Sequence, residues 1–242
     1  MNRPTLLHYL VFFLFSSFFT QGQNHSIDLV IQSIEDLYPS NSLQISTHTD
    51  WSRSHYQERI AHFKEKPLQR GAIVFLGNSI TEQAGDWNER LDISTAENRG
   101  VSGDTTEGVL ARLDEIIYYK PKQLFILIGV NDMFHEHLSA SQIHQNILTI
   151  VDKVTIGSPT TQIFVQTILP TTNETLIGKI KQTNSYLLQS ETTAPYTLIP
   201  LHDAFVLEDG TLKQDLSWDG IHLNENGYQL WQQQIQDLVV SE

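Results

Sequence analysis

The strongest constraint on the fold of this 242-residue chain is an alternation of short apolar runs with longer amphipathic stretches. Each apolar run stops at or just before a glycine or a proline, and the runs occupy residues 72–76, 124–128, 163–168 and 196–199. Runs that are apolar at successive positions are typical of strands covered on both faces. Helical patterns occupy residues 51–66, 105–119, 140–156, 174–190 and 225–240. The alternation predicts an α/β fold, with a parallel sheet between two layers of helices.

The first 22 residues differ from the rest of the chain. Arg3 precedes a mostly apolar run over residues 6–19, and small and polar residues follow it. This order is typical of a secretory signal peptide, and the run is shorter than the about 20 residues that span a bilayer. We therefore expect cleavage after Gly22, export to the periplasm or the exterior of a bacterial cell, and no stable membrane insertion. Residues 23–242 are expected to form one domain, with its core over about residues 51–240.

Composition excludes several classes of function. Fifteen lysines and arginines against 28 acidic residues give a formal charge of −13. Such a charge disfavours nucleic acid and anionic lipid surfaces as partners. The chain has no cysteine, which excludes disulfides, thiolate metal sites and cysteine nucleophiles.

Polar loops follow the predicted strands, at the edge where parallel sheets bind their ligands. A serine hydroxyl becomes a good nucleophile when an imidazole takes its proton, and that imidazole needs an acceptor to orient it. Ser79 is the candidate nucleophile, His222 the candidate base, and Asp219, three residues earlier, the candidate acceptor. The backbone amides of Ser79 and Gly103 and the side-chain amide of Asn131 are candidate donors to an oxyanion.

These loops resemble the four sequence blocks of the SGNH hydrolases, also called GDSL-type esterases and lipases. Residues 74–81 contain Ser79, residues 98–105 contain Gly103, residues 128–132 contain Asn131, and residues 219–224 contain Asp219 and His222. The chain is most similar to the platelet-activating-factor acetylhydrolase-like branch. One position departs from the family motif, because Asn78 stands where the motif has Asp. That position is not a member of the triad, so the four roles are retained.

The resemblance implies a flavodoxin-like three-layer α/β/α sandwich with a five-stranded parallel sheet. It also implies a serine esterase without metal or cofactor, which hydrolyses short-chain acetyl esters of small molecules or glycans through an acyl-enzyme. A lysophospholipase or thioesterase for longer chains, or a non-catalytic binding protein of the same fold, remain alternatives. The candidate substrate-binding residues lie after strand ends or beside the triad acid: Met133, Phe134, Leu169 and Trp218.

Other interpretations exist for several of these positions. Ser79 and Asn131 also suit a helix cap and a turn. Asp203 is a second candidate for the triad acid, and His135, Glu136 and His137 could approach a metal, although such a loop is usually solvated.

The remaining expectations concern structure rather than chemistry. Asp104 is predicted to cap the helix that follows it, with Glu107 completing a capping box. Large aromatic residues are predicted to lie in the core, namely Phe63, Trp87, Phe125 and Trp231.

Overall fold

The computed structural model describes residues 33–239. The predicted signal peptide, residues 1–22, lies outside the described residues. Over the described part of the chain, no helix combines the length and the apolar character that crossing a membrane requires.

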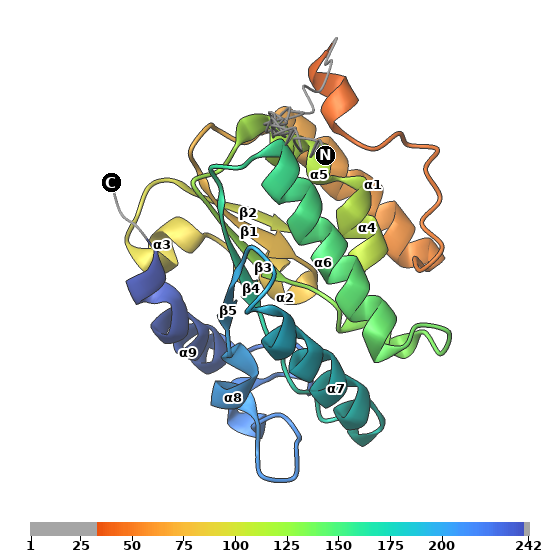
Figure 1. Ribbon diagram of the computed structural model, residues 1–242, viewed down its shortest axis with the longest axis vertical. Coiled ribbons are helices and arrows are strands. Elements are labelled where there is room, and N and C mark those ends of the chain that lie inside the picture. The colour runs from red at the N-terminus through yellow and green to blue at the C-terminus, as the bar shows by residue number, and fades with distance from the viewer. Residues whose placement is uncertain (1–32, 240–242) are drawn as a thin grey trace, which may run out of the picture.

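Five parallel strands form a single sheet in the order β2-β1-β3-β4-β5 (Figure 1). The strands are β1 (Ile73–Gly77), β2 (Ala96–Gly100), β3 (Gln123–Leu127), β4 (Gln162–Gln166) and β5 (Thr197–Ile199). Helices cover both faces, so the predicted α/β sandwich with a five-stranded parallel sheet is confirmed. The sequence pattern missed one strand, because β2 lies at the sheet edge and carries polar residues. Residues 98–100 end this strand rather than forming part of a loop.

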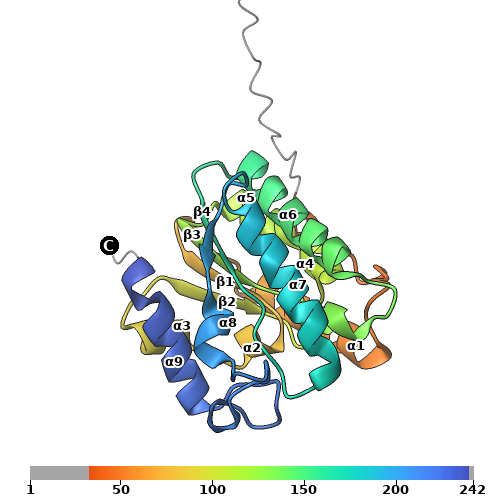
Figure 2. The ribbon, with the colours of Figure 1, turned by 60° about the horizontal axis from the view of Figure 1, so that its bottom comes forward.

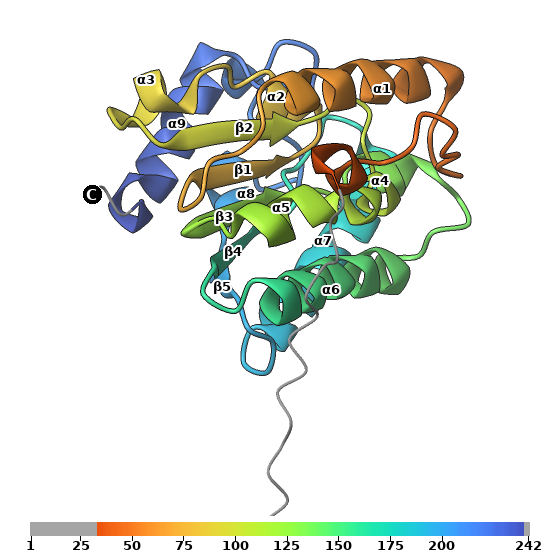
Figure 3. The same cartoon turned by 90° about the horizontal axis from the view of Figure 1, so that it is seen from above.

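The helices form two layers around the sheet (Figure 2). One layer contains α4 (Thr106–Ala111), α5 (Leu113–Tyr119), α6 (Ala140–Gly157) and α7 (Glu174–Ser190). The other contains α3 (Trp87–Leu91), α8 (Leu201–Phe205) and α9 (Glu225–Ile235). The short α2 (Ser79–Glu82) directly follows β1, and α1 (Asp50–Glu65) runs beside the edge strand β2 (Figure 3). Between residues 33 and 239, four short 3₁₀ segments complete the elements: η1 (Ile34–Leu37), η2 (Asn131–Phe134), η3 (Gln214–Leu216) and η4 (Gln236–Leu238).

The helix predicted over residues 105–119 is interrupted at Arg112, which leaves helical geometry with φ −120° and ψ 23°. Its guanidinium donates to the carbonyl of Gly77, at the end of β1, and to that of Arg99, in β2. Arg112 thus connects the start of α5 to the ends of two strands, and the Gly77 carbonyl also accepts from the Val101 amide. The helix predicted over residues 225–240 also ends early, because α9 gives way to η4 after Ile235.

Stacked aromatic rings form the centre of the core. Phe75, Phe125 and Phe164 occupy one register on β1, β3 and β4, with ring centroids 5.0 and 4.6 Å apart. Trp87 stacks on Phe75 at 4.0 Å, and Trp231 meets Trp87 edge-on at 4.9 Å. The predicted burial of Trp87, Phe125 and Trp231 is therefore confirmed.

Phe63 is also buried as predicted, but in a second cluster beneath α1. This cluster joins α1 to the segment before it and to Val101, just beyond the end of β2. Tyr56 of α1 also donates to the carbonyl of Gly108 in α4, over 2.9 Å. The cluster therefore holds α1 against the edge of the sheet at which the strands end.

Candidate functional site

Ser79 lies at the first position of α2, immediately after β1. Asn78 occupies the N-cap, and its Oδ1 accepts a hydrogen bond from the Ile80 amide at 3.0 Å. Asparagine caps a helix as well as aspartate does, so the departure at position 78 leaves this turn intact. Because Asn78 makes the cap, the Ser79 hydroxyl is not used for it. Ser79 Oγ instead lies 2.9 Å from Nε2 of His222.

His222 is oriented from its other side by Asp219. The distance from Nδ1 of His222 to Oδ2 of Asp219 is 2.7 Å, and Oδ1 of Asp219 accepts from the backbone amides of Ile221 and His222. Partial burial acts to raise the pKa of Asp219, but the hydrogen bonds from the His222 ring and the two amides outweigh it and lower the pKa to about 2. Asp219 is therefore ionised near neutral pH, and Ser79, His222 and Asp219 form one connected chain of hydrogen bonds.

The competing acid, Asp203, has a different partner. Its carboxylate is exposed and lies 3.5 Å from Nδ1 of His202, at the beginning of α8. The histidine that contacts Ser79 is paired with Asp219 instead. The geometry therefore favours Asp219 over Asp203 as the orienting acid.

Gly103 lies in a tight turn beyond the end of β2. The Asp104 amide donates to the Val101 carbonyl over 3.0 Å, which closes a four-residue turn. Gly103 occupies its third position with φ +78°, a conformation that L side chains rarely adopt. A Cβ at this position would lie only 2.7 Å from the Cβ of Ser52 in α1. Both the backbone angle and the packing therefore require glycine.

Asn131 connects this turn to the end of β3. It begins η2, and its Nδ2 donates to the Asp104 carbonyl over 2.8 Å. That bond uses one of the two amide hydrogens and orients the other. Within residues 33–239, the backbone amides of Ser79 and Gly103 donate to no other protein group. The three donors named from the sequence thus lie beyond the ends of three adjacent strands, β2, β1 and β3.

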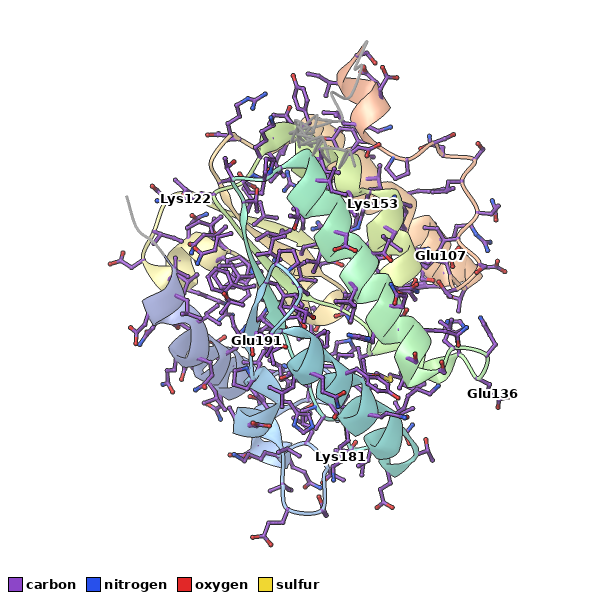
Figure 4. All side chains as sticks on the ribbon, viewed as in Figure 1. Glu107, Lys122, Glu136, Lys153, Lys181 and Glu191 are labelled. Atoms are coloured by element: carbon purple, nitrogen blue, oxygen red, sulfur yellow. The ribbon has the colours of Figure 1, made fainter. Side chains whose placement is uncertain are left out.

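Asp104 does not cap α4, contrary to the prediction. Thr105 is the N-cap residue, and the fully buried Asp104 carboxylate pairs with Arg112 and lies 3.1 Å from Nε2 of His48. A buried carboxylate needs such partners because burial penalises an unpaired charge. Glu107 forms no capping box with Asp104; it accepts from Ser46 and Thr47, on the segment before α1, and is labelled in Figure 4.

Asp132, the neighbour of Asn131, is also fully buried. Both of its oxygens accept from the Thr106 amide, and the Thr106 hydroxyl donates to one of them. Burial raises the pKa of Asp132 to about 6, although the hydrogen bonds from Thr106 act to lower it. Asp132 thus ties the Asn131 segment to the start of α4.

The four candidate substrate-binding residues fall into two pairs. Met133 and Leu169 are each 2% exposed and pack in the main core. Phe134 is 51% exposed and Trp218 is 77% exposed. Trp218 also borders a surface depression beside the catalytic loop, lined mostly by polar residues: Thr172, Gln214, Ser217, Asp219 and Gly220. Phe134 and Trp218 are therefore accessible from solvent, whereas Met133 and Leu169 are buried, so the predicted contact of these two with substrate has no exposed surface to form it.

The segment from His135 to His137 lies in an outlying loop. The rings of His135 and His137 meet edge-on at 5.6 Å, and Glu136 projects away from the body of the molecule (Figure 4). Over the part of the chain that the structure describes, no three His, Cys, Asp or Glu side chains come together as a metal site would require.

Sequence reasoning missed three residues near the site: His48, His55 and Glu82. Glu82 ends α2 and contacts both Ser102 and His55. His48 and His55 belong to the segment around the start of α1, far from the four blocks in the sequence. A histidine or glutamate on a helix looks like an ordinary surface residue, so the sequence carries no strong signal for these contacts.

Comparison with known proteins finds one family model and several relatives that match this chain. The model of the GDSL-like lipase/acylhydrolase family matches residues 75–230. Platelet-activating factor acetylhydrolase IB subunit alpha1 of Rattus norvegicus is 31% identical over 188 residues, covering 74% of this chain and 77% of the relative. The alpha2 subunit of the same organism is 30% identical over 164 residues, covering 64% and 70%.

Solved structures share the fold. A GDSL-like lipase from Bacteroides thetaiotaomicron superposes with a TM-score of 0.68 at 19% identity, covering 76% of this chain and 97% of that one. A variant of an acetyl-xylooligosaccharide esterase from Geobacillus gives a TM-score of 0.59 at 17% identity, covering 73% and 97%. At these identities the likeness concerns the fold.

Proposed function

The chain belongs to the GDSL-like lipase/acylhydrolase family and is a carboxylic ester hydrolase, and we propose that it cleaves short-chain esters, chiefly acetyl esters, through an acyl-enzyme on Ser79. The observation that carries the proposal is the connected chain from Ser79 Oγ through His222 to Asp219, with hydrogen bonds of 2.9 and 2.7 Å. These distances are within the range that general-base activation of a serine requires.

The mechanism follows from these contacts. His222 Nε2 accepts the proton of Ser79 as Oγ attacks the ester carbonyl, and Asp219 stabilises the imidazolium that forms. The amides of Ser79 and Gly103 and the side chain of Asn131 donate to the negative oxygen of the tetrahedral intermediate. His222 then protonates the leaving alcohol, and the same residue activates the water that releases the acid from Ser79.

Two observations favour a short acyl group and a polar leaving group. Met133 and Leu169 are part of the packed core, so their side chains leave little room there for a long chain. The depression beside Asp219 is lined mostly by polar groups and bordered by the exposed Trp218, which suits the alcohol portion of a polar ester such as an acetylated glycan. The rat relative at 31% identity is named an acetylhydrolase, which supports the same acyl group.

A chain-length series tests the acyl preference. The purified enzyme is assayed on p-nitrophenyl esters from acetate to palmitate, with Ser79→Ala as the control for uncatalysed release. We expect the highest kcat/KM for acetate, and then acetate release from acetylated xylo-oligosaccharides. A maximum at octanoate or longer would favour the lysophospholipase or thioesterase alternative, and full activity of Ser79→Ala would remove the nucleophile assignment.

We further propose that the enzyme is exported, on the strength of the sequence pattern in residues 1–22. Expression of the full chain in a bacterial host, followed by mass measurement of the periplasmic and external fractions, tests this. We expect a product shortened by about 22 residues outside the cytoplasm. A full-length product confined to the cytoplasm would contradict the proposal.

A further inference from the structure

Glu82 links the nucleophile helix to the turn that carries Gly103. The Ser102 hydroxyl donates to Oε2 of Glu82 over 2.7 Å, and the Ser102 amide donates to the same oxygen. Nε2 of His55 lies 2.9 Å from this oxygen and 3.0 Å from the other. The Glu82 side chain is 18% exposed. One carboxylate therefore holds Ser102, the residue immediately before Gly103, by two charge-assisted hydrogen bonds.

The orientation of the Ser102–Gly103 peptide decides where the Gly103 N–H points. Positive φ at Gly103 and not at Ser102 is the pattern of a type II turn. The common type I turn differs from it mainly in the central peptide, which is rotated by roughly 150–180° between the two. That rotation would reverse the direction of the Gly103 N–H. A contact that fixes Ser102 therefore determines whether the Gly103 N–H points toward the oxyanion or away from it.

The first turns of α1 support the same peptide from the other side. The Cβ of Ser52 and the indole of Trp51 lie closest to the open face of Gly103. Trp51 stacks on the ring of His55, with centroids 5.3 Å apart and planes 6° apart. His55 in turn contacts Glu82. The turn is thus enclosed between α1 and the end of α2.

Arg59 balances the charge of this arrangement. Its Nε lies 3.4 Å from Oε1 of Glu82, and its guanidinium also donates to the Gly100 carbonyl. Burial acts to raise the pKa of Glu82, but hydrogen bonds from His55 and Ser102 and the charge of Arg59 outweigh it and lower the pKa. The carboxylate is therefore ionised, while the cation beside it reduces its repulsion of a developing oxyanion.

We propose that Glu82 is a positioning residue of the oxyanion hole, which holds Ser102 so that the Gly103 N–H points toward the reacting carbonyl oxygen. The inference rests on the proposed role of Gly103 in ester hydrolysis. His55 and Arg59, which hold Glu82, lie in α1, before the residues that the family model matches. The helix outside the matched segment would therefore contribute to catalysis.

Glu82→Gln tests the proposal, with Glu58→Gln as its matched control. Glu58 lies on α1, 3.9 Å from Nδ1 of His55, but its side chain is 74% exposed. Because a hydrogen bond to a charged group is worth about 1.5–3 kcal/mol, we expect kcat of Glu82→Gln on p-nitrophenyl acetate to fall by about tenfold or more. KM should change less than about twofold, because the oxyanion forms after substrate binding. Glu58→Gln should match the wild type.

A second measurement separates positioning from general damage. A phenylboronic acid forms a tetrahedral adduct with the active serine, and its affinity should fall in Glu82→Gln by the same factor as kcat. Unchanged kcat and boronate affinity would overturn the inference, as would a rise in KM that accounts for the whole loss of kcat/KM.

If Glu82→Gln does not fold, Ser102→Ala is the deciding variant, and a wild-type kcat in Ser102→Ala would contradict the inference. If Asn131→Ala loses activity and Glu82→Gln keeps full activity, this inference alone is rejected. Full activity in Ser79→Ala would reject the proposed function itself.

Discussion

The loop that carries Asp219 and His222 and the turn that carries Gly103 meet at Ser79, but they are supported differently. The loop is half-exposed and held mostly by its own hydrogen bonds, because Ser217 accepts from the Gly220 amide and donates to the His222 carbonyl. From outside the loop, the Thr172 amide donates to the Gly220 carbonyl. The turn is held by buried side chains, such as Arg112 on Asp104 and His48, which reaches Asp104 across 56 residues. Changes in the loop should therefore affect chemistry with little effect on stability, whereas changes around the turn should affect both.

The largest effect is expected from His222→Ala. Without the base, kcat should fall by about 10⁴ or more, as for removal of a triad member in other serine hydrolases. The melting temperature should change little, since the ring is partly exposed and the loop keeps its backbone hydrogen bonds. Steady-state kinetics and thermal unfolding check both points, and His137→Ala, an exposed histidine, is the control. Wild-type activity of His222→Ala would contradict the claim that His222 is the base.

Arg112→Met should have the largest effect on stability. The change leaves the fully buried Asp104 carboxylate without its cation and removes one donor from each of the carbonyls of Gly77 and Arg99. Breaking a buried pair costs about 3–5 kcal/mol of unfolding free energy. Denaturant unfolding measures this, with Asp50→Asn as the control. Asp50 forms an exposed pair with Arg53, so its loss should cost about 1 kcal/mol or less. Equal losses in the two variants would contradict the claim that the buried pair stabilises the turn.

Asn131→Ala should lower kcat by about 10²–10³, the usual cost of one oxyanion donor, with KM nearly unchanged. The same side chain holds the Asp104 carbonyl, so a modest loss of stability should accompany the kinetic effect. The exposed Asn226 provides Asn226→Ala as a control in the same assay. A rise in KM at constant kcat would instead assign Asn131 to ground-state binding.

The smallest effect concerns pH and stability. The folded pKa of Asp132 is about 6, above the value of about 3.9 in an unfolded chain. The folded state therefore binds the proton more tightly, and this contribution is fully present below pH 4 and lost as the pH rises to 6. The difference is on the order of 3 kcal/mol, and Asp132→Asn should remove it.

The contribution of Asp219 to the free energy of unfolding depends on pH in the opposite direction. Its folded pKa of about 2 is depressed, so its contribution is present above pH 4 and lost as the pH falls toward 2. Unfolding free energies measured from pH 3 to 7 on the wild type, Asp132→Asn and Asp219→Asn compare the two carboxylates. Identical pH profiles for the wild type and Asp132→Asn would contradict the assignment.

The same contrast explains how much the sequence could predict. Asp219 and His222 are three residues apart, so one short loop determines their contact. The apolar runs predicted β1 and β3, whose carboxyl ends bring Ser79 and Asn131 to one edge of the sheet. These contacts follow from local patterns and from a general rule of parallel sheets.

The supports of the turn could not be predicted in this way. Glu82 reaches Ser102 across 20 residues, and His48 reaches Asp104 across 56. Such pairs depend on how α1 packs against the sheet edge, which no local pattern encodes. Asp104 precedes a helix, so the local pattern predicts a cap. In the structure its carboxylate is buried and pairs with Arg112 instead. The edge strand β2 was missed because its residues, Ala96–Gly100, include no continuous apolar run.

The central claim is that the Ser79 hydroxyl is the nucleophile that His222 activates. Reaction with a fluorophosphonate, followed by peptide mass spectrometry, tests it most directly. The account predicts that the wild type gains a single phosphonyl group, located on Ser79, and that Ser79→Ala gains none. Labelling of a different residue, or of Ser79→Ala at the wild-type rate, would contradict it.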